Sequence, residues 1–149
     1  MTHSSQIQYR RAARTDFTSV SELLEPFVQQ QQLLPRSESE LHKLLECAYV
    51  AIDSEQIVGF CAVEIYSRKL AELQGLAVTD SQQRRGIGRR LVELCIELAR
   101  KNNVHELMAI TSSEELFREC GFDYALPDQK RALFMHPLPL GLPTQANGT

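Results

Sequence analysis

The chain has 149 residues, of which 43% are hydrophobic and 23% charged, as is ordinary for one globular domain. Its net charge of −3 gives no general attraction to nucleic acid or to an anionic membrane. No apolar run approaches the roughly 18 residues that cross a bilayer, and residues 1–5 are too short and polar for a secretory signal. We therefore expect a cytoplasmic protein with no nucleic-acid or membrane partner.

The first half of the chain predicts helices and strands that follow one another closely. We expect a strand at 7–13 and then a helix to about residue 30, capped by Thr15 or Asp16 and broken or bent at Pro26. Ser37 and Glu40 have capping-box spacing and predict a second helix to about residue 47. Strands at 49–52 and 56–66 follow, joined by a turn at 53–55.

The second half begins with a strand at 71–78 and a helix at 89–101 whose apolar residues recur at the helical period. A fifth strand is expected at 106–111 and a short helix from Ser112 or Ser113 to Glu119, ended by Gly121. Candidate final strands lie at 122–125 and 132–135. The tail from Pro137 is rich in proline and small polar residues, and we expect it to be frayed.

The four cysteines predict neither a metal site nor a disulfide framework. Cys47, Cys61, Cys95 and Cys120 are scattered, form no Cys-x-x-Cys pair, and lie in apolar surroundings typical of small core residues. No histidine has ligand spacing to any of them, so no metal is expected.

The most informative segment is Gln83-Arg84-Arg85-Gly86-Ile87-Gly88, which joins the strand at 71–78 to the long helix. Glycines at such a joint let backbone N–H groups converge, and the helix N-terminus adds about half a positive charge. The segment therefore predicts a cradle for a phosphate group. It lacks the Gly-Lys-Ser/Thr of a P-loop and the third glycine of a dinucleotide fold.

Three motifs in this order resemble the GNAT superfamily of acyl-CoA-dependent N-acyltransferases. Gln83-x-x-Gly86-x-Gly88 matches its pyrophosphate loop, and the strand from Ala71 to Val78 looks like its fourth strand. Residues 116–122 look like its (Leu/Phe)-(Tyr/Phe)-x-x-x-Gly-Phe segment. The resemblance covers roughly residues 6–136.

The resemblance implies an α/β (α+β) GNAT fold, with a mixed sheet of six to seven strands and about four flanking helices. Parallel strands four and five would splay apart, and acetyl-CoA would bind in the splay. We expect one acetyltransferase domain at 1–136 and a flexible tail at 137–149. The cofactor-binding residues implied are Leu76, Ala77, Val78, Gln83, Arg84, Arg85, Gly86, Ile87, Gly88, Arg89 and Phe117.

Glu72 is the candidate general base, because some GNAT members carry a glutamate in the same Ala-Glu-x-x-x-Leu-Ala-Val context. Period-2 alternation predicts that Glu72 shares a face with Gln74 and Leu76. A backbone N–H near Ala77 or Val78 would stabilise the oxyanion. Many members use a tyrosine where this chain has Phe117, so water, Ser112 or Ser113 would have to protonate the leaving thiolate.

The acceptor side resembles the acetyltransferase domain of N-acetylglutamate synthase, through the segments 33–37 and 126–134 and through Lys69. Cationic side chains on two sides suit a dicarboxylate. The resemblance implies a role in arginine biosynthesis, without the synthases' regulatory kinase-like domain. The substrate-binding residues expected are Arg36, Ser37, Lys69, Thr111, Ser112 and Arg131.

Together these features predict acetyl transfer to the α-amine of a small acidic amino acid, with L-glutamate first. Transfer would be direct, in a ternary complex, because no cysteine lies where an acyl-enzyme nucleophile is expected. Acetylation of a peptide N-terminus, lysine or polyamine is an alternative, and so is a non-catalytic acyl-CoA-binding module. Many family members pair through sheet edges or late strands, which leaves a homodimer open.

Overall fold

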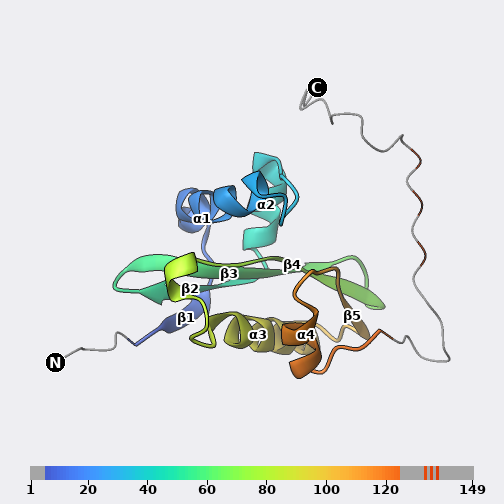
Figure 1. Ribbon diagram of the computed structural model, residues 1–149. Coiled ribbons are helices and arrows are strands. Elements are labelled where there is room, and N and C mark those ends of the chain that lie inside the picture. The colour runs from blue at the N-terminus through green and yellow to red at the C-terminus, as the bar shows by residue number, and fades with distance from the viewer. Residues whose placement is uncertain (1–5, 125–132, 134, 136, 138–149) are drawn as a thin grey trace.

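The computed structural model describes residues 6–124, together with 133, 135 and 137. A central sheet has two helices on each face (Figure 1). The strands are β1 (Gln8–Arg11), β2 (Ala48–Asp53), β3 (Gln56–Ile65), β4 (Leu70–Val78) and β5 (Glu106–Ala109). The helices are α1 (Phe17–Gln29), α2 (Glu38–Leu45), α3 (Ile87–Lys101) and α4 (Glu114–Glu119), with short 3₁₀ turns η1 (Arg14–Asp16) and η2 (Asp80–Gln82).

The strand order is β1-β2-β3-β4-β5, and every neighbouring pair is antiparallel except β4 and β5, which are parallel. The β2–β3 hairpin turns at Ser54 and Glu55, which both have positive φ, 51° and 69°. A two-residue turn with positive φ at both positions matches the right-handed twist of the two strands that it joins. Crossing from β4 to the parallel β5 requires the long helix α3, which packs against the sheet.

Two apolar clusters, one on each face of the sheet, hold the layers together. Helices α1 and α2 cover one face through Val20, Leu24, Leu41, Leu44 and Leu45, against Phe60 of β3. On the other face α3 inserts residues at helical spacing, including Leu91, Val92 and Cys95, against Cys61, Val63 and Leu73. Cys61 and Cys95 are fully buried free thiols, as expected for core residues.

A bulge at Gly75 changes which face of the sheet the side chains of β4 occupy. Ala62 pairs with Gln74, but Phe60 pairs with Ala77, so β4 has one more residue than β3 over this stretch. Gly75 has φ of +69°, which glycine adopts readily. Leu73 before the bulge packs on the α3 face, whereas Ala77 after it packs on the α1–α2 face. The prediction that Leu76 shares a face with Glu72 is therefore wrong.

The parallel pairing of β4 with β5 ends halfway along β4. It runs from Leu70 opposite Glu106 to Leu73 opposite Ala109, while β4 continues to Val78. Within the described part of the chain, residues 74–78 thus have no strand partner on that side. The expected splay between strands four and five is confirmed, and it begins at the Gly75 bulge.

The predicted elements are confirmed apart from small shifts and three corrections. Pro26 does not break α1, which continues to Gln29. Residues 122–124 form no strand, and the described residues contain five strands rather than six to seven. Most of the other expected final strand, at 132–135, lies outside the described residues. The capping box of α2 is present, because Glu40 N donates to Ser37 Oγ and Ser37 N donates to Glu40 Oε2.

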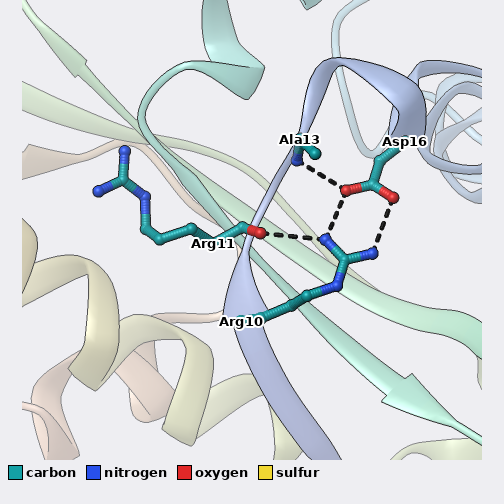
Figure 2. A network of polar contacts seen from close by, with 4 residues as sticks. All are labelled: Arg10, Arg11, Ala13 and Asp16. Carbon is teal, nitrogen blue, oxygen red and sulfur yellow. Dashed lines mark hydrogen bonds and ion pairs between the residues drawn. The ribbon is translucent and has the colours of Figure 1, made fainter.

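Asp16 takes the N-cap position of α1, but its side chain makes no capping bond. Instead its two carboxylate oxygens accept bonds from Arg10, with N–O distances of 2.7 and 2.9 Å, as Figure 2 shows. The backbone N–H of Ala13 also donates to Asp16, at 2.7 Å. The bonds from Arg10 lower the pKa of this buried carboxyl group and join β1 to the start of α1.

Candidate active site

The loop between β4 and α3 has the backbone geometry of an anion cradle. Gly86 is the N-cap of α3 and has left-handed φ of 78°, and Arg84 also has positive φ, 67°. Gln83 secures the loop, because its Nε2 donates to Val78 O and to Asp80 Oδ1, both at 3.1 Å. The first N–H groups of α3 point out of its N-terminus, where an anion is favoured.

A cleft of about 1390 Å³ runs from this loop along β4. It contains most of the residues that the sequence predicted for the cofactor, and it is closed on one side by the segment at 110–113 and by α4. The predicted cofactor residues that line it are Leu76, Ala77, Val78, Gln83, Arg84, Gly86, Ile87, Gly88, Arg89 and Phe117. Of the predicted acceptor residues, Arg36, Thr111 and Ser112 line it, as does Glu72.

Three other predicted residues are described but lie outside the lining of the cleft. Arg85 is bonded to Gln82 and forms an ion pair with Asp53 at 3.7 Å. The hydroxyl of Ser37 caps α2. Lys69 is exposed in the turn before β4, so a direct contact of Lys69 with an acceptor is not supported by this geometry. Arg131 lies outside the described residues.

Glu72 belongs to a polar cluster that the sequence did not predict. Tyr66 OH donates to Glu72 Oε1 at 2.7 Å, and Gln74 Nε2 donates to the same oxygen at 3.2 Å. Glu64, which is the cross-strand partner of Glu72, accepts bonds from Tyr66 OH at 3.3 Å and from Gln74 Nε2. The signal available in the sequence was the period-2 spacing of Glu64 and Tyr66 within the strand expected at 56–66, which predicts that both lie on one face.

Burial and the neighbouring carboxylates shift the pKa of Tyr66 in the same direction and that of Arg36 in opposite directions. Burial raises the pKa of Tyr66, and its hydrogen bond to Glu72 raises that pKa further, so the phenol remains a proton donor at neutral pH. Burial lowers the pKa of Arg36, whereas the nearby charges of Glu40, Glu64 and Glu72 raise it. Arg36 remains cationic, because a guanidinium does not lose its proton in proteins.

Arg36 reaches the cluster from the loop between α1 and α2. Its NH2 group donates to Gln74 Oε1 at 3.2 Å, and its NH1 group donates to Leu34 O at 3.2 Å. Because a guanidinium carries five N–H donors, these two bonds leave donors for a ligand in the cleft. Arg36 and Glu72 are therefore joined through a single side chain, Gln74, in the same cleft as the anion cradle.

Phe117 lines the cleft but is 5% exposed. Its ring packs edge-on against Phe122, with 5.3 Å between ring centroids. It has no proton to donate, as the sequence already indicated. Thr111 Oγ1 accepts a bond from Ser113 N at 2.8 Å, which orders the segment opposite β4.

The family model described as "Acetyltransferase (GNAT) family" matches residues 9–122. The chain belongs to the GNAT family. It is also 30% identical over 113 residues to an uncharacterised N-acetyltransferase of Chlorobaculum tepidum, covering 76% of this chain and 73% of that protein. Membership makes the protein an acyltransferase that uses acetyl-CoA.

Amino-acid acetyltransferases are also among the relatives of this GNAT protein. That of Pasteurella multocida is 31% identical over 138 residues, which are 88% of this chain but only 31% of the relative. The N-acetylglutamate synthase of Neisseria gonorrhoeae, solved with coenzyme A and N-acetyl-glutamate, matches with a TM-score of 0.74 and 26% identity. That match covers 87% of this chain and 31% of the synthase. The chain thus spans about three-tenths of these relatives.

A structure from Mycobacterium tuberculosis in complex with CoA and NLQ has a TM-score of 0.73 and 23% identity, covering 80% of this chain and 75% of that one. This likeness concerns the fold alone. Among the described residues, no helix is long and apolar enough to cross a membrane. The same part of the chain contains no group of three His, Cys, Asp or Glu side chains that could hold a metal ion.

Proposed function

We propose that this GNAT protein transfers an acetyl group from acetyl-CoA to the α-amine of a small acidic amino acid, with L-glutamate as the first candidate. The observation that carries the proposal is the junction of Arg36, Gln74 and Glu72 in the cleft that also contains the anion cradle. It places a carboxylate-binding group next to a candidate base. The similarity to amino-acid acetyltransferases supports the same acceptor class.

The residues of the cleft fit two parts of acetyl-CoA, its pyrophosphate and its pantetheine. The loop around Gly86 and the N-terminus of α3 suit the pyrophosphate. Residues 74–78 of β4, which lie beyond the pairing with β5, offer backbone groups to the peptide-like pantetheine. Bound acetyl-CoA supplies a thioester whose carbonyl carbon is attacked by an amine.

The protein's own groups would then act on the acceptor. Glu72 would take a proton from the acceptor amine, so that the nitrogen can form the new C–N bond as the C–S bond breaks. Water, Ser112 or Ser113 would donate a proton to CoA, which leaves as the thiolate. A backbone N–H of Ala77 or Val78 donates to the thioester oxygen where negative charge develops. Arg36 holds the carboxylate of the acceptor, and such positioning can contribute roughly 7–11 kcal/mol to the barrier reduction. Transfer is direct, in a ternary complex.

A second acceptor class is favoured by a different observation. Two carboxylates, Glu64 and Glu72, lie beside Arg36, and Arg36 is the cation of this cluster among the described residues. A diamine or an amino acid with a cationic side chain would meet this negative charge. The experiment below therefore offers both classes.

The test measures free thiol released from acetyl-CoA with L-glutamate, L-aspartate, L-lysine, L-arginine and spermidine offered separately. We expect turnover with glutamate, and in Arg36→Ala a KM for glutamate raised about 10- to 100-fold, since a charge-assisted hydrogen bond contributes about 1.5–3 kcal/mol. Arg36→Lys should recover part of this loss. The matched control is Arg100→Ala, on the exposed face of α3. This substitution should leave kcat and the KM for glutamate unchanged.

The outcomes distinguish between the two acceptor classes and test the role of Arg36. Turnover with cationic amines alone would replace the acidic acceptor by the second class and leave the cofactor assignment intact. An unchanged glutamate KM in Arg36→Ala would refute the role of Arg36. If none of these five amines is acetylated although acetyl-CoA binds, both proposed acceptor classes are refuted.

A further inference from the structure

The side chain of Glu72 is held by one of its two carboxylate oxygens. Oε1 accepts the bonds from Tyr66 OH, at 2.7 Å, and from Gln74 Nε2, at 3.2 Å. Within the described residues, Oε2 accepts no hydrogen bond. The two oxygens are thus chemically different: one is occupied by donors and the other remains for an incoming proton.

The two donors are themselves held in this orientation. Gln74 Oε1 receives the bond from Arg36, so the amide nitrogen of Gln74 must face the carboxylates. Tyr66 OH accepts a bond from Gln74 Nε2 at 3.2 Å, and its one proton faces Glu72 Oε1 at 2.7 Å more closely than Glu64 Oε2 at 3.3 Å. Because burial and the adjacent carboxylates raise the pKa of Tyr66, its hydroxyl keeps that proton. Tyr66 is 53% exposed and lines the cleft beside Glu72.

We propose that Tyr66 is a positioning residue that fixes the carboxylate of Glu72 with Oε2 available to the acceptor amine. The inference rests on the proposed role of Glu72 as the base. Tyr66 directly follows the last residue of β3 and Glu72 lies near the start of β4, so the contact depends on the hairpin between these strands. A glutamate has three rotatable side-chain bonds, and a donor from the neighbouring strand selects among its rotamers.

The position of a base controls the rate of proton transfer more than the binding of either substrate. A displacement of about 1 Å can cost 10²-fold in rate. For Tyr66→Phe we therefore expect a kcat lowered about 10- to 100-fold, with the KM for acetyl-CoA unchanged and the acceptor KM within about threefold. Substitution of a half-exposed tyrosine by phenylalanine keeps the ring, so the melting temperature should not change.

The matched control is Tyr124→Phe. Tyr124 is an exposed tyrosine that also donates to a glutamate, Glu114, but it lies outside the lining of the cleft. The same atom is removed from a similar pair, and kcat should stay as in the parent protein. A fall in both variants would mean that loss of any surface tyrosine hydroxyl disturbs the protein, and would overturn the inference.

A double-mutant cycle gives the decisive measurement. Glu72→Gln alone should lower kcat about 10²- to 10⁴-fold, as loss of a general base does. If Tyr66 acts through Glu72, adding Tyr66→Phe to the Glu72→Gln protein should not lower kcat any further. If the losses multiply instead, Tyr66 acts independently, for instance on the leaving thiolate, and the inference is wrong.

The cycle also separates this inference from the proposed function. It is run with whichever amine the wild-type protein acetylates, so a wrong acceptor does not affect it. A Glu72→Gln protein with full activity would refute the base, and with it the role given to Tyr66. A strong effect of Glu72→Gln without any effect of Tyr66→Phe would refute the positioning role alone.

Discussion

Replacement of Gly75 by alanine should destabilise the protein more than the same change at another left-handed glycine. Gly75 has φ of +69°, and a Cβ there would lie 3.0 Å from Cε1 and 3.4 Å from Cδ1 of Phe60. Phe60 is completely buried between the sheet and α1–α2, so its ring cannot move without disturbing that cluster. Gly86 has φ of +78°, but a Cβ there would meet nothing within 4 Å.

Alanine at either position must adopt a left-handed backbone conformation, but only alanine at Gly75 also meets a neighbouring side chain. A left-handed conformation costs a non-glycine residue about 1–2 kcal/mol, and overpacking in a core adds about 1–3 kcal/mol. We therefore expect Gly86→Ala to lose about 1–2 kcal/mol of unfolding free energy and Gly75→Ala about 2–5 kcal/mol. For a chain of this size 1 kcal/mol corresponds to about 2–4 °C in Tm.

The assay is urea and thermal unfolding of the two variants and the wild type without acetyl-CoA, followed by circular dichroism at pH 7. Working without the cofactor keeps any effect of Gly86 on binding out of the comparison. Equal losses at the two positions would refute the steric argument, because they would show that the core around Phe60 accommodates an extra methyl group.

Two further predictions concern an ion pair and the cofactor loop. Asp16→Asn should lower the unfolding free energy by about 2 kcal/mol at pH 7, because Arg10 donates two bonds to this carboxylate. Arg10 lowers the pKa of Asp16 in the folded state, so its contribution is complete above the unfolded pKa of about 3.9 and is lost as pH falls through the lower folded pKa. The difference in unfolding free energy between wild type and Asp16→Asn, measured by urea unfolding, should be smaller at pH 3 than at pH 7; an undiminished difference at pH 3 would contradict the assignment. Gln83→Leu removes the bonds to Val78 O and Asp80 Oδ1 and should raise the KM for acetyl-CoA about tenfold with kcat retained, whereas an unchanged KM would show that the loop holds its shape without Gln83.

Local chemistry made the loop that we propose for the cofactor predictable from sequence. The glycines and glutamine of 83–88 and the helical period of the following segment act over a few residues, so the pattern alone indicates a cradle at a helix N-terminus. The capping box of Ser37 and Glu40 and the glycine at 121 after α4 are local in the same way. Each of these features is present in the structure.

The arrangement of the side chains in the proposed acceptor site depends on contacts between segments that are far apart in the chain. Glu64 and Tyr66 meet Glu72 and Gln74 only because β3 and β4 are antiparallel in one particular register. Arg36 joins them from a loop 38 residues before Gln74. Lys69, which is adjacent to β4 in sequence, is exposed in a turn outside the cleft. No rule that acts over a few residues predicts that Arg36 lies in the cleft and Lys69 outside it.

The sequence by itself therefore determined the order of the elements and the anion cradle, which follow from periodicity and turn chemistry, and its three motifs indicated the family by resemblance. Only the tertiary structure decided which side chains share the cleft. The bulge at Gly75 is the clearest reason: one additional residue in β4 moves Leu76 to the opposite face from Glu72 and Gln74. Its position is set by packing against Phe60 and by pairing with β3, which no alternation along β4 could indicate.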